Sequence, residues 1–189
     1  MKMPVYLYGH PVLRKKSLPI DADYPELKQL VDDMFDVMYE SDGVGLAAPQ
    51  IGKNIRLIVI DADPAAEHNP ECKDRKLVLV NPELTILEGD LVTRDEGCLS
   101  VPGLSEPVTR VEHILLKWLD EDFNAHEEEI TGFLARIVQH EFDHLEGILY
   151  VDRINILRKQ FIRKKLANIA EGRTRCSYPV KYAPQKGHK

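Results

Sequence analysis

Two histidines four residues apart, His140 and His144, are the residues whose types and spacing most clearly suit chemistry. Four residues make about one helical turn, so a helix here would present both imidazoles on one face as metal ligands. Glu141 would lie about 100° further round the helix, where its carboxylate could act as a general base on an activated water without binding the metal. The same pattern also fits a surface helix that binds nothing, and a metal site needs at least one more ligand.

The helix that must position these side chains is predicted to begin after Thr131, a residue that can cap it, and to end near Gly147. Phe133 and Ile137 precede the two histidines at steps of four and three residues, on the same helical face. The metal-binding face is therefore also an apolar face, as a buried site requires.

The third ligand must come from elsewhere in the chain. The extended peptidase motif H-E-x-x-H-x-x-G-x-x-H fails, because Tyr150 occupies its last position. A zincin-type metallopeptidase would use a later glutamate, but Glu146 is too close and Glu171 lies beside the terminal stretch. Cys98 is the good candidate, since a thiolate is a strong ligand for zinc or ferrous iron. Taken alone, Cys98 is explained more simply as a buried cysteine at the end of a strand.

Three stretches taken together resemble the signature motifs of the peptide deformylase family. They read Gly-Val-Gly-Leu-Ala-Ala-Pro-Gln at 43–50, Glu-Gly-Cys-Leu-Ser at 96–100 and Gln-His-Glu-Phe-Asp-His at 139–144. Their order and separation match as well, and the resemblance extends from about Tyr6 to Leu166. The combination of three motifs is far more specific than the histidine pair alone.

The resemblance implies a metal-dependent hydrolase that removes the N-formyl group from nascent peptides beginning with formyl-methionine and releases formate. It implies one ferrous ion per chain, which zinc or nickel can replace. On the matching positions, the metal ligands would be Cys98, His140 and His144.

The resemblance also implies roles for four further residues. Glu141 would be the general acid and base, while Gln50 and the backbone N–H of Leu99 would stabilise the developing oxyanion. Gly45 would offer backbone hydrogen bonds to the peptide. Amide hydrolysis needs such a set, namely a nucleophile, an oxyanion stabiliser and a proton for the leaving amine. An apolar methionine pocket is expected, with candidates chosen by spacing: Val44, Phe133 and Ile137.

The fold class is predicted to be α+β, with short mixed or antiparallel strands around a central metal-binding helix and a further helix near the C-terminus. The 189 residues suffice for one domain with a sizeable core. We expect a single catalytic domain over residues 1–170 and a loosely held basic tail over residues 171–189. In the last helix, at 155–170, the expected inner residues are Ile156, Phe161, Ile162, Leu166 and Ile169.

The composition is that of an ordinary globular protein, with 43% hydrophobic and 30% charged residues. No apolar run approaches the ~20 residues of a membrane span, and the first residues do not read as a signal peptide. Cys72, Cys98 and Cys176 are an odd, scattered set, which suggests a reducing compartment and no disulfide framework. We therefore expect a cytoplasmic enzyme without membrane or DNA partners.

Charge is unevenly distributed along the chain. From Asp152 onward there are eleven Lys and Arg against two acids, whereas residues 1–151 carry fourteen against twenty-nine. A solvated helix and tail would explain this asymmetry, but a ribosome contact or a non-enzymatic RNA-binding role would also use it. The basic residues of the last predicted helix are Arg158, Lys159, Arg163, Lys164 and Lys165.

An ion pair between Glu96 and Arg110 is also predicted. A carboxylate beside a thiolate ligand suffers like-charge repulsion unless a cation compensates it. Arg110 ends the strand that we expect to return beside the Cys98 motif, and its guanidinium could fix that motif through two hydrogen bonds.

Overall fold

The computed structural model describes residues 3–184, which contain three α-helices and nine β-strands. The helices are α1 (Leu27–Glu40), α2 (Gly132–Leu145) and α3 (Ile156–Ala170). The strands are β1 (Val5–Tyr6), β2 (Gly45–Ala47), β3 (Leu57–Asp61), β4 (Lys76–Ile86), β5 (Leu91–Gly97), β6 (Ser105–Val111), β7 (His113–Leu119), β8 (Ala125–Thr131) and β9 (Val180–Lys181). No helix in this part of the chain has the length and apolar composition needed to cross a membrane. The α+β class predicted from the sequence is confirmed.

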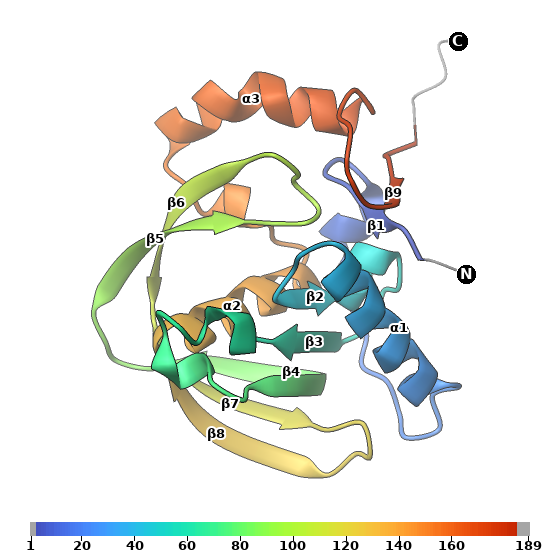
Figure 1. Cartoon of the computed structure of the whole chain (residues 1–189), viewed down its shortest axis with the longest axis vertical. Helices are drawn as coiled ribbons and strands as arrows, with labels where there is room; N and C mark the ends of the chain where they lie inside the picture. The colour runs from blue at the N-terminus through green and yellow to red at the C-terminus, as the bar shows by residue number, and fades with distance from the viewer. Residues whose placement is uncertain (1–2, 185–189) are drawn as a thin grey trace.

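The central position of α2 follows from how the strands are arranged. Strands β2, β3, β4, β7 and β8 form one antiparallel sheet in that spatial order, while β5 and β6 form a separate antiparallel hairpin. Figure 1 shows α2 between the five-stranded sheet and this hairpin. On the hairpin side, the Gln139 amide donates a 2.9 Å hydrogen bond to the carbonyl of Val111. The helix predicted to carry the metal site is therefore held from two sides.

The two ends of α2 are formed by different local interactions. Thr131 ends β8 and stands at the N-cap position, but its side chain makes no capping hydrogen bond. The prediction that Thr131 caps the helix was wrong. Instead, a Glu71 carboxylate oxygen accepts a 2.7 Å hydrogen bond from the backbone N–H of Phe133. Gly147, with φ of +72°, follows the end of the helix as predicted.

Two clusters of buried apolar side chains hold these layers together. On α1 the apolar residues that recur at helical spacing are buried, namely Leu27, Leu30, Val31, Met34, Val37 and Met38. The second cluster joins Leu134, Ala135 and Val138 of α2 to the sheet residues Ile58, Ile60, Leu79, Ile114 and Leu116. Each fully buried aliphatic side chain of this kind contributes roughly 1.5–3 kcal/mol relative to exposure. The helix with the candidate ligands is thus anchored in the core.

The inner face of α3 is narrower than its sequence pattern suggests. Ile162, Leu166 and Ile169 are buried, whereas Ile156 and Phe161 are 73% and 84% exposed. The buried residues lie at steps of four and three residues and form one stripe. Phe161 is one residue away from this stripe, about 100° round the helix, so it faces solvent. The prediction that both exposed residues lie inside was wrong.

The stretch after Gly172 returns along the body of the protein as far as it is described. Strand β9 pairs in parallel with β1, with Val180 opposite Val5. The N–H of Leu7 also donates to the carbonyl of Lys181 at 3.0 Å. Figure 1 shows β9 beside β1. Residues 171–189 were predicted to be loosely held, and the last five of them lie outside the described residues.

Candidate active site

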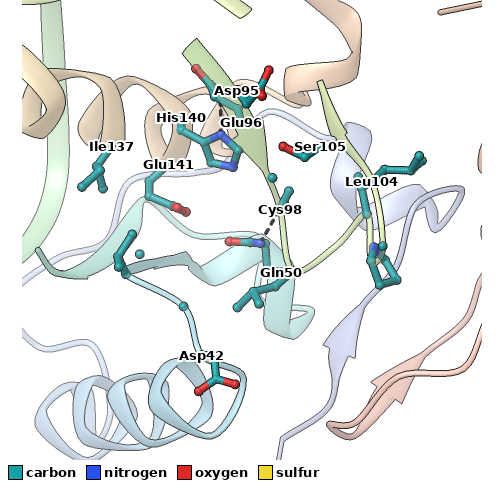
Figure 2. A pocket seen from close by; sticks show the side chains of 18 of the residues that line it. Asp42, Gln50, Asp95, Glu96, Cys98, Leu104, Ser105, Ile137, His140 and Glu141 are labelled. Carbon is teal, nitrogen blue, oxygen red and sulfur yellow. Dashed lines mark hydrogen bonds and ion pairs between the residues drawn. The ribbon is translucent and has the colours of Figure 1, made fainter. Parts of the chain in front are cut away.

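Three metal-binding side chains converge at one point of the structure. Cys98 follows β5, while His140 and His144 stand on α2, and one ligand atom from each lies within 4.8 Å of the others. Cys98 Sγ and His144 Nε2 are 3.3 Å apart. In Figure 2, Cys98 and His140 point into the same space, beside Glu141 and Gln50. The fold therefore brings the histidine pair to the cysteine that sequence reasoning selected.

The surroundings of this cluster fit a divalent metal ion. Thiolate and imidazole are the donors that zinc and ferrous iron take readily. Nδ1 of His140 lies 2.9 Å from a Glu96 carboxylate oxygen, which orients the ring and turns Nε2 towards the cluster. Burial lowers the pKa of His140, but hydrogen bonds with Cys98 and Glu96 outweigh it and hold the pKa well above its usual value. Burial instead holds the pKa of His144 well below its usual value, so this imidazole stays neutral, as a metal ligand must be.

Glu141 is buried beside the cluster and stands against the backbone of Gly45 in β2. A Cβ at position 45 would lie 2.6 Å from Glu141 Oε1, so a larger residue would displace the carboxylate. Burial raises the pKa of Glu141 to about 7, near the value at which a group can both take and return a proton at neutral pH. Its Oε2 has no hydrogen-bond partner within residues 3–184. That atom is free to act on a bound molecule.

Gln50 is held with its amide nitrogen towards the thiol. Its Oε1 accepts from the backbone N–H of Ala47 at 2.8 Å, and its Nε2 donates to Ser100 Oγ at 3.2 Å and lies 3.6 Å from Cys98 Sγ. The stretch that leads to Gln50 forms the short strand β2 and a 3-10 helix over Ala48–Ile51. The glycines and small side chains allow this close packing against α2.

A cavity of about 710 Å³ opens beside the cluster. Its walls include the three residues proposed for an apolar pocket, Val44, Phe133 and Ile137. Leu99, next to the cysteine, also lines it, and its carbonyl accepts a 2.7 Å hydrogen bond from the Tyr178 hydroxyl. The volume is within the range of about 300–1,000 Å³ found for ligand pockets, so the cavity can take more than a formyl group.

Glu96 is the centre of a buried ion-pair network behind the cluster. Arg110 donates to its two carboxylate oxygens at 2.7 and 2.9 Å, so the predicted pair is confirmed in bidentate form. Arg136 donates to the same carboxylate at 2.7 Å, and Arg110 also reaches Asp143 at 2.9 Å. Burial raises the pKa of Glu96, but hydrogen bonds from Arg110 and His140 outweigh it and hold the pKa well below its usual range. Glu96 therefore stays ionised and keeps His140 in place.

Replacing Arg110 with alanine is expected to lower the free energy of unfolding by about 3 kcal/mol, because it removes three charge-assisted hydrogen bonds from the buried carboxylates of Glu96 and Asp143, which keep only Arg136 and Arg153 as cations. Urea denaturation followed by circular dichroism measures this loss. Lys117→Ala is the matched control, since it breaks an ion pair with Glu127 in which both side chains are more than half exposed. An equal loss of unfolding free energy in both variants would mean that the buried network stabilises the protein no more than an exposed ion pair, and would contradict the prediction.

Comparison with known proteins decides between the candidate enzyme classes. The family model described as polypeptide deformylase matches residues 2–160. The chain belongs to this family. It is 42% identical to the peptide deformylase of Flavobacterium psychrophilum, over 98% of this chain and 100% of the relative. Among solved structures, peptide deformylase 1B of Arabidopsis thaliana superposes with a TM-score of 0.80 at 40% identity, covering 90% of this chain and 91% of that chain. The peptide deformylase of Thermus thermophilus gives 0.77 at 41% identity, covering 87% and 95%.

Some residues of this deformylase site were not found by sequence reasoning. Arg136 is 1% exposed and joins Glu96 to Glu112, a role that was not predicted from the sequence. Its position one helical turn before His140 was a usable signal, because residues four apart share a face. Tyr178 had no such signal, since its contact with Leu99 joins parts of the chain that are far apart in sequence.

Proposed function

We propose that the chain carries out the reaction of its family at the cluster of Cys98, His140 and His144. Peptide deformylases hydrolyse the N-formyl group of nascent peptides that begin with formyl-methionine, and the products are formate and a free amine. The observation that carries the assignment of residues is the convergence of one thiol and two imidazoles beside a buried, unpartnered carboxylate oxygen of Glu141.

Cys98, His140 and His144 would hold one divalent metal ion. When bound, the ion supplies Lewis-acid chemistry, which polarises a carbonyl and makes water more acidic. We propose ferrous iron as the native metal, with zinc or nickel as replacements, because the thiolate and imidazole donors suit all three. A thiolate donor with ferrous iron also makes the enzyme sensitive to oxygen.

Glu141 would move the protons of the reaction. A carboxyl group with a pKa of about 7 can take a proton from the attacking water and then deliver it to the leaving amine. The contact with Gly45 keeps this carboxylate beside the cluster, so the transfer needs no movement of α2.

Gln50 and Leu99 would stabilise the negative charge that develops on the formyl oxygen. The Gln50 amide is held by Ala47 and Ser100 with its N–H groups towards the cluster, so it is oriented before the substrate binds. The backbone N–H of Leu99 would be the second donor. Donors placed in advance avoid reorganisation during the reaction, which is why such sites are effective.

The apolar walls of the cavity would select methionine as the first residue of the substrate. Val44, Phe133 and Ile137 all line the cavity beside Glu141, so an unbranched thioether side chain could lie against them. The formyl carbon carries only hydrogen. A narrow space at the cluster would therefore exclude larger acyl groups and spare ordinary peptide bonds.

The reaction is tested by offering the purified protein a formyl-Met tripeptide and a longer unformylated peptide under anaerobic conditions. Release of formate from the first without cleavage of the second is expected. Cleavage of internal bonds without formate release would instead support a zincin-type peptidase and contradict the proposal.

We further propose that α3 contacts the ribosome. Two of its cations already have partners within the protein, since Arg158 binds Glu106 and Lys159 binds Asp152. On α3, three exposed cations have no ion-pair partner among residues 3–184, namely Arg163, Lys164 and Lys165. A cationic helix on an otherwise acidic protein would bind RNA phosphates through this element alone.

Reversing these three charges to glutamate is expected to weaken co-sedimentation with ribosomes at least about tenfold, and to leave hydrolysis of a short formyl-Met peptide nearly unchanged. Binding by the unmodified protein should fall steeply with salt, because each phosphate contact releases counterions. A matched control reverses three exposed lysines elsewhere: Lys15, Lys53 and Lys73. Equal loss of binding in both triple variants, or binding that ignores salt, would contradict a contact through α3.

The cytoplasm, where nascent chains are made, is the compartment that we propose for this activity. All three cysteines are free thiols in the structure, which fits a reducing environment.

A further inference from the structure

The C-terminal segment Arg175–Tyr178 forms one wall of the active-site cavity. It lies outside the residues that the family model matches and far along the chain from the three motifs. The other walls come from the residues before β2, from the β5–β6 hairpin and its turn, and from α2. The cavity is therefore lined by part of the C-terminal region as well as by the family motifs.

This wall is fixed on both sides of Arg175. On the C-terminal side of Arg175, the Tyr178 hydroxyl donates a hydrogen bond to the carbonyl of Leu99, which lies beside the candidate ligand Cys98. The carbonyl of Pro179 also accepts a 2.9 Å hydrogen bond from the N–H of Val5. Before Arg175, the carbonyl of Thr174 accepts a hydrogen bond from the Tyr182 hydroxyl. Arg175 thus has a defined place at the cavity.

Two arginines among the described residues line the cavity, and Arg175 is the one that is available to bind a ligand. Arg136 also lines it, but this side chain is buried and bound to Glu96 and Glu112. Arg175 is exposed, and no acidic side chain among the described residues pairs with it. The exposed carboxylates of the cavity, Asp42 and Asp95, lie at opposite ends of the view in Figure 2.

We propose that Arg175 is a specificity-determining residue that favours an acidic side chain in the peptide segment after formyl-methionine. The inference rests on the proposed function, because the first substrate residue must occupy the apolar walls near Glu141. The residues after it then leave along the cavity, where the guanidinium of Arg175 can donate two hydrogen bonds to a carboxylate. The effect is modest, since the pair is partly open to water.

The test compares kcat/KM for formate release from formyl-Met-X-Ala and formyl-Met-Ala-X, with X as Glu, Gln or Lys. We expect the unmodified enzyme to prefer Glu over Lys about fivefold in at least one series at low salt, and less at high salt. Arg175→Gln should remove this preference and Arg175→Glu should reverse it. Lys164→Glu is the matched control, because it makes the same change of charge on α3, outside the cavity lining.

An unchanged preference in Arg175→Glu, or a loss of preference in Lys164→Glu as well, would overturn the proposal. So would equal kcat/KM for Glu and Lys peptides in the unmodified enzyme. In each of these cases formate is still released, so the proposed function stands. No formate from any of the peptides would overturn both, and the two failures are therefore distinguishable.

Discussion

Glu141→Ala is expected to lower kcat for formate release by about 10²–10⁴-fold, the usual contribution of a positioned general acid and base. Glu141 is the buried carboxyl group beside the cluster, and its Oε2 has no partner among the described residues. The metal should largely remain, because the three candidate ligands are other side chains. Steady-state kinetics and metal analysis of the same preparation measure both quantities.

Two controls separate proton transfer from structural damage. Glu141→Gln keeps the size of the side chain against Gly45 but cannot exchange a proton in the same way, so it should be about as inactive as the alanine variant. Glu127→Ala removes an exposed carboxylate on β8 that does not line the cavity, and should leave turnover unchanged. Near-normal turnover in Glu141→Gln would contradict the assigned role.

Cys98→Ser is expected to lower metal affinity by more than about 100-fold and to reduce formate release correspondingly. Loss of an outer partner of a metal ligand already costs about 10- to 100-fold, and loss of a ligand itself should cost more. A hydroxyl is a poor anionic ligand, since its pKa lies far above that of a thiol. Competition with a coloured chelator measures the affinity.

Cys72→Ala is the matched control for this cysteine substitution. Cys72 is buried in the second apolar cluster and is not among the candidate ligands, so its loss should affect stability while one metal per chain remains. Full metal occupancy with near-normal turnover in Cys98→Ser would refute the ligand assignment.

Much of the site could be predicted from the sequence, because its parts are local. His140, Glu141 and His144 lie on one helix, where periodicity alone fixes their relative positions. Gln50 and Cys98 were found through motifs whose order is specific, and the structure brings both to the same helix. The Glu96–Arg110 pair was predictable as well, since the repulsion between a carboxylate and a thiolate calls for a cation nearby.

The parts that were missed depend on contacts across the chain. Phe161 is apolar and was counted among the inner residues of α3, but it lies one residue away from the stripe of Ile162 and Leu166 that packs against the body. Glu71 caps α2 from a distant loop, which no local capping rule would indicate. The pairing of β9 with β1, and with it the wall formed by Arg175–Tyr178, joins the two ends of the chain. Short strands of two residues carry too little pattern to be found in advance.

The most direct test of the account is a metal titration of the stripped protein with formate release as the readout. The protein is freed of metal with a chelator under anaerobic conditions, and ferrous iron is added back in steps. We predict that the rate of formate release from a formyl-Met peptide rises linearly and stops rising at one ion per chain, and that Cys98→Ser shows no such break at one equivalent. Full formate release by the stripped protein, or none at any amount of ferrous, zinc or nickel ion, would contradict a metal-dependent deformylase built on Cys98, His140 and His144.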